Sequence, residues 1–358
     1  MTDDALPSLP FAVRRLVLEV EAIDVLRLPR FAGSALRGAY GRALRRLTCM
    51  TGAPSCDGCR LVQSCPFPRL FEPPPRDLSH VGLRANAFSP TPPFAIEPPD
   101  LGGIPIAAGR HWRFGVRLFG HAWRDATLVI EAFRRALLSG LTTARASGRL
   151  TRVILDTADG GHDLYDPENH RLSTCEEVPQ LLFKPASRLS LEMITPLRLQ
   201  SNGRRLCPSA FTARRLGADI ARRARLLSAV CADSSAYASA RQWPVKDWLD
   251  DLEAARTSAD LHWMDWERFS TRQKRAICTG GWLGTLAITG LTPAGSALFQ
   301  IGSVIGLGKE CVFGFGQYSI EDNTPRTYGA FDAPRATTSN ASGPSVERVL
   351  VVGTDQVF

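Results

Sequence analysis

The order of apolar segments occurs twice along the 358 residues, and this recurrence limits the fold more than any other feature. In the first half, branched apolar residues predict strands at Phe11–Glu21, His111–Gly120 and Leu150–Asp156. Apolar residues at helical spacing predict helices at Ser34–Leu47 and Asp125–Ser147. This order fits a ferredoxin-like βαββαβ domain in which one strand of the hairpin is poorly marked.

The same order returns after residue 185. It comprises a strand, a basic helix, a hairpin, a second helix and a closing strand, at Arg188–Leu199, Ala210–Ala229, Ala276–Leu291, Pro293–Ile305 and Cys311–Ile320. The sequence therefore predicts an α+β protein with two tandem ferredoxin-like (RRM-like) domains, residues 1–185 and 186–321. The first domain carries a Cys-rich and Pro-rich insertion at residues 49–105. Residues 322–358 are polar and low in charge, so we expect a disordered tail there.

Two features bear on where such a chain works. The stretch from Ala276 to Gly308 has no charged residue, but glycines and Pro293 interrupt it, so we expect buried strand, turn and helix and no membrane span. The first eleven residues lack the basic and apolar regions of a signal peptide. Nine cysteines, an odd number, favour a reducing, cytoplasmic compartment, where clustered cysteines bind metal more often than they form disulfides.

The basic charge of the chain is carried by arginine. Four of the 43 basic residues are lysines, so 39 are arginines, and the formal net charge is +8. Guanidinium groups pair bidentately with phosphate and stack on bases, which favours a polyanionic partner, although a GC-rich genome would produce the same skew. Two predicted helices carry arginine faces, formed by Arg37, Arg42 and Arg46 on the first and by Arg214, Arg215, Arg222, Arg223 and Arg225 on the second. Such faces are either solvated surface or an electrostatic footprint for RNA.

A glycine-rich segment, GLGKECVFGFG, runs from Gly306 to Gly316. It lies between a helix and the last strand, whereas a dinucleotide fingerprint lies between a strand and a helix. A P-loop is excluded because Glu310 follows Lys309. The remaining alternatives are a plain connecting loop and a turn whose exposed N–H groups approach a phosphate backbone. On the second interpretation, the RNA-binding residues are Gly306, Gly308, Lys309, Phe313, Gly314 and Gly316.

Four cysteines lie within seventeen residues with the spacing C-x6-C-x2-C-x5-C: Cys49, Cys56, Cys59 and Cys65. A C-x2-C pair at the centre of such a run can wrap one tetrahedral ion, and zinc is the usual ion of a closed thiolate site. An iron–sulfur cluster fits the spacing as well. Four protein ligands leave no open position for a substrate, so we expect a structural site. The other cysteines are isolated and are expected in the core: Cys175, Cys207, Cys231, Cys278 and Cys311.

Together these motifs resemble the RAMP superfamily, and within it the CRISPR-associated endoribonucleases that process precursor CRISPR RNA. The resemblance rests on the glycine-rich form G-x-G-K-x4-G-x-G and, in matching order, on Pro29–Arg46, Leu191–Leu199 and Trp263–Gln273. It implies a C-terminal RAMP domain and a grip on a repeat RNA hairpin. It also implies cleavage without a catalytic cofactor, in which the ribose 2′-OH attacks the adjacent phosphate and leaves a 2′,3′-cyclic phosphate. The implied partners are CRISPR repeat RNA, crRNA and other CRISPR effector subunits.

The chain departs from that family in its histidines. None of the six occupies the family's catalytic positions on the first helix or just before the glycine-rich loop. Either arginine, lysine and tyrosine carry out catalysis, or activity has been lost. On the first alternative, the expected catalytic residues are Arg30, Arg37 and Arg42 as phosphate clamps and Tyr40 as proton donor, in a histidine-poor variant of a minor, type IV-like, system.

Two further functions compete with the endoribonuclease. One is a non-catalytic RAMP subunit that holds the crRNA handle inside an effector complex. The other is a DNA-binding regulator built on the zinc site, which would prefer duplex DNA.

Overall fold

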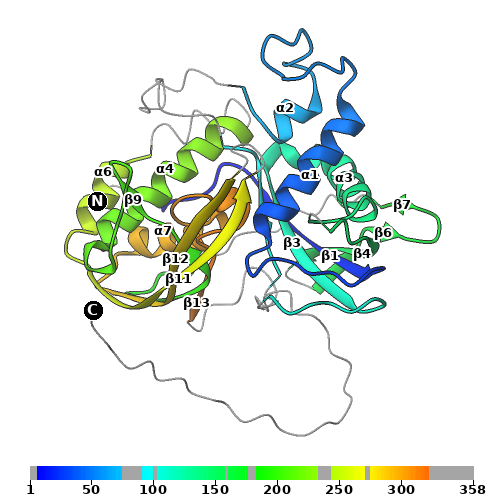
Figure 1. Ribbon diagram of the computed structural model, residues 1–358. Helices are drawn as coiled ribbons and strands as arrows, with labels where there is room; N and C mark the ends of the chain where they lie inside the picture. The colour runs from blue at the N-terminus through cyan, green and yellow to red at the C-terminus, as the bar shows by residue number, and fades with distance from the viewer. Residues whose placement is uncertain are drawn as a thin grey trace, which may run out of the picture.

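The computed structural model describes residues 6–74, 91–99, 103–142, 144–157, 160–173, 175, 183–232, 243–270 and 275–321. The expected tail, residues 322–358, lies outside them, as do His80 and parts of the Cys-rich insertion. Figure 1 shows two α+β bodies side by side, the first in blue to green and the second in green to orange. This arrangement confirms the predicted tandem ferredoxin-like folds.

The first domain is a five-stranded antiparallel sheet with two main helices on one face. Its sheet order is β2-β3-β1-β4-β5, which is the ferredoxin-like order with β5 added at one edge. The elements of the domain are β1 (Val13–Ala22), α1 (Gly33–Thr48), α2 (Pro66–Leu70), β2 (Phe94–Glu97), β3 (His111–Phe119), η3 (Gly120–Asp125), α3 (Ala126–Leu138), β4 (Gly148–Thr157), β5 (Gly160–Asp163), and the hairpin β6 (Tyr165–Asp166) and β7 (Arg171–Leu172).

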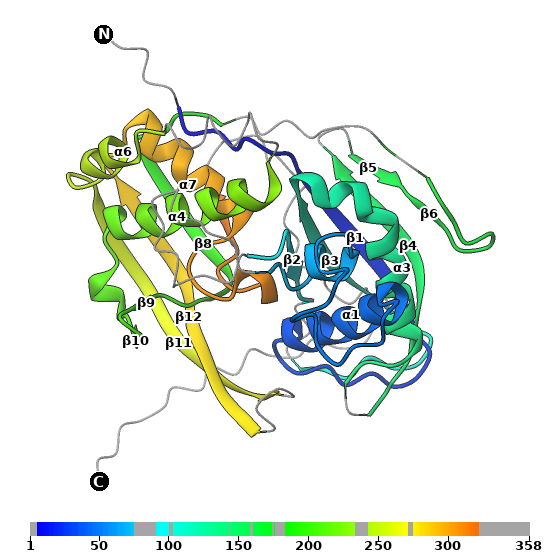
Figure 2. The ribbon, with the colours of Figure 1, turned by 90° about the horizontal axis from the view of Figure 1, so that it is seen from above.

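The second domain repeats the plan with a four-stranded sheet in the order β11-β12-β8-β13. Figure 2 shows α4 and α7 lying together on one face of that sheet. The elements are β8 (Arg188–Leu197), the short hairpin β9 (Gln200–Ser201) and β10 (Arg204–Arg205), η4 (Pro208–Ala210), α4 (Ala213–Cys231), α6 (Val245–Asp251), β11 (Arg256–Ser270), β12 (Arg275–Thr289), α7 (Pro293–Ile305), η5 (Cys311–Phe313) and β13 (Tyr318–Glu321).

Strand β1 shows how period-2 alternation produces the two cores. Leu16, Leu18 and Val20 point to one face and pack in the first core beneath α1 and α3. On the opposite face, Val13 is fully buried and packs in the core of the second domain. Because one strand contributes to both cores, the two domains share buried surface.

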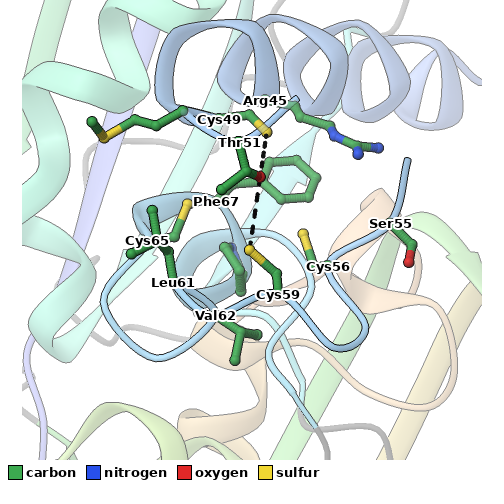
Figure 3. Close-up of a pocket in the computed structure, with 12 residues that line it drawn as sticks. Arg45, Cys49, Thr51, Ser55, Cys56, Cys59, Leu61, Val62, Cys65 and Phe67 are labelled. Atoms are coloured by element: carbon green, nitrogen blue, oxygen red, sulfur yellow. Dashed lines mark hydrogen bonds between the residues drawn. The ribbon is translucent and has the colours of Figure 1, made fainter. Parts of the chain in front are cut away.

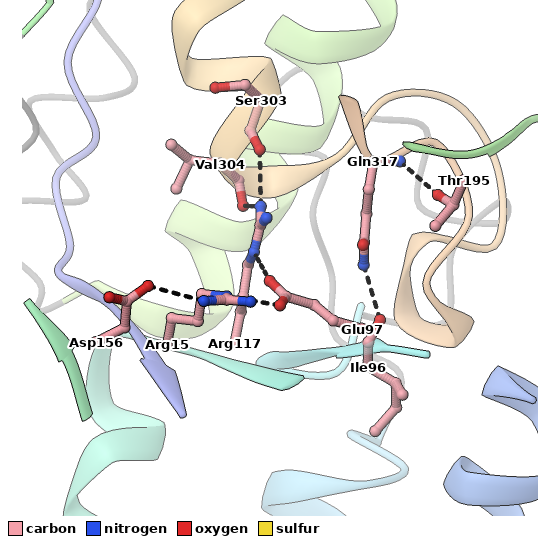
Figure 4. Close-up of polar contacts among 9 residues, drawn as sticks. All are labelled: Arg15, Ile96, Glu97, Arg117, Asp156, Thr195, Ser303, Val304 and Gln317. Carbon is pink, nitrogen blue, oxygen red and sulfur yellow. Dashed lines mark hydrogen bonds and ion pairs between the residues drawn. The ribbon is translucent and has the colours of Figure 1, made fainter. Parts of the chain in front are cut away.

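A buried group of charges links the two domains (Figure 4). Glu97, on β2, accepts a hydrogen bond from Arg15 Nε at 2.6 Å and another from Arg117 Nε. Arg117 also donates to the carbonyl oxygen of Ser303 at 2.7 Å and to that of Val304, in the last turn of α7. The charge of Arg117 thereby meets the negative end of the α7 dipole.

Burial by itself raises the pKa of Glu97, but the charges of Arg15 and Arg117 outweigh this effect and hold the pKa below its ordinary value. The side chains of Arg117 and Glu97 are only 2% and 1% exposed, so water screens their attraction little. We name the side chains of Arg15, Glu97 and Arg117 the interdomain charge cluster.

Three sequence predictions were wrong in detail. The helix predicted at Asp125–Ser147 ends at Leu138, because Gly140 takes a φ of +90° and a tight turn follows it. The segment predicted as a hairpin at 276–291 is one long strand up to Thr289, since β12 pairs with β11 over its whole length. The segment 311–320 is mostly a turn, and β13 begins only at Tyr318.

The two glycines that suggested a turn within β12 serve close packing instead. A Cβ on Gly281 would lie 2.6 Å from the Cβ of Pro196, and one on Gly280 would meet the Trp263 ring at 2.5 Å. The uncharged stretch itself forms most of β12 and all of α7. Within the part of the chain that the structure describes, no helix is both long and apolar enough to cross a membrane.

We predict that Glu97→Gln lowers the free energy of unfolding by about 3 kcal/mol, because it removes the carboxylate that two buried arginines share and leaves Arg15 with Asp156 as its carboxylate partner. The matched control is Asp163→Asn, which breaks the ion pair with Arg152. The side chains of Arg152 and Asp163 are 47% and 55% exposed. The control substitution should lower the free energy of unfolding by less than about 1 kcal/mol. Urea unfolding followed by circular dichroism measures both, and equal losses would contradict a dominant role for the interdomain charge cluster.

The same carboxylate predicts a pH dependence. The pKa of Glu97 is lower in the folded chain than its ordinary value of 4.5. Its stabilisation is therefore present above the unfolded-state pKa and is lost as the pH falls through the folded-state pKa. Glu97→Gln should consequently show a shallower loss of stability than the unchanged protein in urea titrations carried out below pH 4.5.

Candidate functional site

The glycine-rich loop, residues 306–316, packs directly against the N-terminal turns of α1. A Cβ on Gly33 would lie 1.8 Å from the carbonyl oxygen of Phe313, so only glycine permits this approach. The rings of Phe31 and Phe315 lie 4.4 Å apart between centroids. Figure 2 shows the orange segment after α7 beside β2 and next to α1. We name this contact between residues 30–42 and residues 306–316 the α1–loop junction.

Arg37 occupies the centre of the α1–loop junction. Its guanidinium lies 4.1 Å from the centroid of the Phe71 ring and 4.9 Å from that of Phe313, within the range of cation–π contacts. It also donates to the carbonyl oxygen of Phe71 at 3.4 Å. Burial lowers the pKa of Arg37, and its Nε atom is buried without a hydrogen-bond partner in the described part of the chain. Arg37 therefore retains an unused donor.

Three other arginines of this region face solvent: Arg30, which precedes α1, and Arg42 and Arg46 on α1 are exposed. Arg45, also on α1, is half-buried. A Cβ on Gly38 would lie 3.5 Å from an Nη atom of Arg42, so the Arg42 side chain turns back by one turn toward the N-terminus of α1. This orientation directs its charge toward the α1–loop junction.

Tyr40 does not occupy the position expected of a proton donor. It is 1% exposed and stacks on Phe133 with ring centroids 4.6 Å apart. Burial raises the pKa of its hydroxyl well above the ordinary value. A proton donor must reach the bound RNA, and the burial of Tyr40 does not suit that role. Leu36, Tyr40 and Leu44 lie at helical spacing, and all three are buried in the core.

The loop glycines support close packing within the protein. Cβ atoms on Gly308, Gly314 and Gly316 would meet the carbonyl oxygens of Arg198, Ile96 and Leu307 at 2.4, 2.6 and 1.8 Å. Each of these glycines has a positive φ, and the same holds for Gly306. Substitution at any of them would displace the loop from α1 and β2.

The N–H groups of the loop are largely used inside the protein. Lys309 N–H donates to the Arg198 carbonyl at 2.9 Å, and Gly316 N–H donates to the Pro196 carbonyl at 3.0 Å. Intraprotein hydrogen bonds also engage the N–H groups of Gly306, Leu307, Phe313 and Gly314. The expected cradle of exposed N–H groups is therefore not formed by these residues. The exposed side chain of Lys309 is what the loop presents to solvent.

The basic face predicted on α4 is divided among several roles. Arg214 pairs with Asp250 at 2.8 Å and with Glu253 at 3.2 Å. Arg223 is buried and donates to the carbonyl oxygen of Ile305 at 2.6 Å. Arg222 lies 3.3 Å from Asp219. Of the predicted RNA-binding residues on α4, Arg215 is exposed, whereas Arg214 and Arg222 are half-buried.

Arg198, which follows β8, is a residue of this region that the sequence motifs did not indicate. Its carbonyl anchors the loop through Lys309, and its guanidinium pairs with Glu310 at 3.0 Å and lies 5.8 Å from the Phe315 centroid. The sequence feature that could have indicated Arg198 is its position near the end of the Leu191–Leu199 motif. Another cation–π pair joins Arg205 to Trp263, with 4.0 Å between the guanidinium and the ring centroid.

The four clustered cysteines line one pocket at the C-terminal end of α1 (Figure 3). Thr51 Oγ1 lies 3.8 Å from the sulfur of Cys49 and 3.8 Å from that of Cys59. In the described part of the chain, no three histidine, cysteine or acidic side chains converge as a preformed metal site. The metal site therefore stays a prediction.

The isolated cysteines differ in environment. Cys231 and Cys311 are buried, as expected. Cys207 is exposed and Cys175 is half-buried, so the core interpretation was wrong for these two. The side chain of Cys278 lies outside the described residues.

Known proteins resemble the chain in both halves. Residues 9–177 match a family model of an N-terminal domain, AF_1859_N. An uncharacterized protein of Archaeoglobus fulgidus is 24% identical over 177 residues, which is 49% of this chain and 57% of that protein. The chain thus spans little more than half the length of this curated relative.

Solved structures of similar proteins share low identity with the chain. A Cas6 product complex is 15% identical, with 86% of this chain and 99% of that chain covered and a TM-score of 0.48. Thermus thermophilus Cas6 is 15% identical, with 87% and 98% covered and a TM-score of 0.44. A partial Cas6-RT-Cas1–Cas2 complex is 14% identical, with 88% and 47% covered and a TM-score of 0.49.

The second domain provides the more informative match. Residues 191–318, which include most of β8, the helices α4 and α7 and the whole glycine-rich loop, match the model of the CRISPR-associated endoribonuclease Cas6. The C-terminal domain of the chain is therefore similar to the Cas6 family.

Proposed function

We propose that this protein binds CRISPR repeat RNA at the α1–loop junction and cleaves precursor crRNA there. One observation carries the proposal: the arginine-bearing N-terminal part of α1 packs against the glycine-rich loop of the Cas6-matching domain. Arg37 and Phe313 make this contact across the two domains. Arg30, Arg42 and Lys309 are exposed on the same two segments.

The charges of this region suit a phosphate backbone. Guanidinium groups form charge-assisted, bidentate hydrogen bonds with phosphate oxygens. The exposed Arg42 and Lys309 can release counterions from RNA, which is the main source of affinity for a backbone. Arg37 is held by two aromatic rings, so its half-buried guanidinium is already oriented and little side-chain entropy is lost on binding.

The proposed reaction is an internal transfer at phosphorus. The ribose 2′-oxygen forms a bond to the adjacent phosphorus while the bond from phosphorus to the 5′-oxygen breaks, leaving a 2′,3′-cyclic phosphate and a 5′-hydroxyl. The 2′-OH proton is lost to solvent, and the leaving oxygen takes a proton from solvent. No metal takes part in this scheme. Arginine keeps its proton in proteins, so Arg37 and Arg42 act by positioning the phosphate and stabilising the charge of the phosphorane.

A second candidate function has one observation in its favour. Tyr40 is buried, and neither α1 nor the loop contains histidine, so these two segments lack the residue most often used for proton transfer. Clamping without proton transfer would suit a non-catalytic subunit that holds the crRNA handle beside other CRISPR effector subunits. Such a protein would bind repeat RNA at the same junction and leave it intact.

Cleavage of repeat RNA in the presence of EDTA separates the two functions. We expect the unchanged protein to cut and to leave a cyclic phosphate, identified by end-group analysis. Arg37→Ala and Arg42→Ala should each slow single-turnover cleavage roughly 100-fold, as expected when one charge-stabilising donor is lost. Binding should weaken far less, because several other basic residues remain.

The matched control for these variants is Arg152→Ala, an exposed arginine on β4 that pairs with Asp163. Its cleavage rate should stay within about twofold of the unchanged protein. Alanine at His121, whose pKa burial lowers, should also leave cleavage intact. Tight binding without any cutting would support the non-catalytic subunit, and preference for duplex DNA over repeat RNA would exclude both proposals.

Salt dependence distinguishes exposed from paired basic residues. Lys309→Ala and Arg46→Ala should each reduce the slope of log affinity against log salt by roughly 0.7–0.9, the value expected for one lost phosphate contact. Arg214→Ala should change the slope little, because Asp250 and Glu253 already neutralise Arg214. Fluorescence anisotropy with labelled repeat RNA at several salt concentrations measures the slopes. An equal change in all three variants would contradict this placement of the RNA.

A further inference from the structure

The four clustered cysteines are attached to fixed points of the first domain. Cys49 follows α1 directly, and its N–H donates to the Arg45 carbonyl at 2.8 Å. Cys65 directly precedes α2 and lies with its sulfur 3.9 Å from the Thr48 carbonyl oxygen. Two of the four sulfurs are therefore held near each other by the ends of two helices.

The other two cysteines lie on one tight turn. The N–H of Cys59 donates to the carbonyl oxygen of Cys56 at 3.2 Å, which closes the C-x2-C segment. Gly58 takes a φ of +69° within this turn, a conformation that favours glycine. Such a turn can present both sulfurs to one ion. Figure 3 shows these sulfurs facing the pocket opposite the end of α1.

In the described residues the four sulfurs do not converge on one point, so metal binding requires a local movement. In a tetrahedral zinc site with Zn–S bonds of about 2.3 Å, the sulfurs lie about 3.8 Å apart. Here the Thr51 hydroxyl lies between two sulfurs, with its Oγ1 atom 3.8 Å from both Cys49 Sγ and Cys59 Sγ. Thr51 would have to rotate, and the turn to close, for these sulfurs to approach each other. A Cβ on Gly52 or on Gly58 would meet nothing within 4 Å, so space is available for that movement.

The surroundings also suit a closed thiolate centre. Leu61, Val62 and Phe67 line the pocket and limit the access of water. Arg45 lines it too, and its Nη2 donates to the carbonyl oxygen of Ala53 within the cysteine loop. Four thiolates around one divalent ion carry two negative charges, which the adjacent guanidinium partly balances.

We propose that Cys49, Cys56, Cys59 and Cys65 bind one structural zinc ion that fixes residues 50–64 to the ends of α1 and α2. Binding replaces four S–H protons with four Zn–S bonds and changes no oxidation state, so it needs no redox partner. The centre lies at the opposite end of α1 from the α1–loop junction. It does not depend on the proposed RNA cleavage, and either proposal can fail without the other.

Metal analysis of the full chain, purified under reducing conditions, should find about one equivalent of zinc. Cys56→Ser and Cys59→Ser should each reduce this content at least tenfold. The matched control is Cys207→Ser, because Cys207 is an exposed and isolated cysteine that should not affect metal content. Chelation should lower the Tm of the unchanged protein and of the Cys207 variant, and added zinc chloride should restore it.

Cobalt titration tests the site without any substitution, in case the serine variants fail to fold. Cobalt(II) added to the metal-free chain should produce the absorption of a tetrahedral thiolate complex, with saturation at about one equivalent. The proposal is overturned by a folded chain that takes up neither zinc nor cobalt, or by disulfides among these cysteines in non-reducing mass spectrometry. An iron–sulfur chromophore in anaerobically purified protein would overturn the assignment to zinc.

Discussion

The pairing of Glu97 with Arg15 and Arg117 is the interaction on which the rest of the structure depends. A buried carboxylate is tolerated only when opposite charges surround it, and both arginines contact it directly. Arg117 extends the group to the carbonyls at the end of α7, which is the point where the glycine-rich loop begins. The same short strand that carries Glu97 accepts a hydrogen bond from Gln317 at the Ile96 carbonyl. Strand β2 therefore positions both ends of the loop.

This positioning explains why motifs far apart in the sequence meet. Phe313 and Phe315 reach α1 because the loop is fixed to β2 on one side and to the Pro196 and Arg198 carbonyls on the other. The loop glycines serve this internal packing, whereas the side chain of Lys309 is exposed. The glycine-rich motif of the loop is thus a folding requirement.

Much of the fold could be predicted because apolar periodicity is local. The α7 helix agrees with its predicted bounds, and β1 and β8 agree closely. The ion pairs of α4 could not be predicted. The partners of Arg214 lie on α6 and just beyond it, and only folding brings them close to Arg214. Tyr40 is the opposite case, because its helical spacing with Leu36 and Leu44 indicates the core by itself. The acceptors of the Lys309 and Gly316 N–H groups could not be predicted, because Arg198 and Pro196 lie more than a hundred residues away.

Because β1 packs in both cores, the sequence boundary near residue 185 does not separate two independent hydrophobic cores. Val13 and Phe119 belong to the first domain by sequence but pack in the core of the second, together with Ala95. If the chain were cut at that boundary, the first half would expose these apolar side chains and three charged ones that have no solvent-facing role. The second half would lose part of the wall of its own core. Replacing either repeat with a homologous half would therefore also require replacing the apolar surface that faces it.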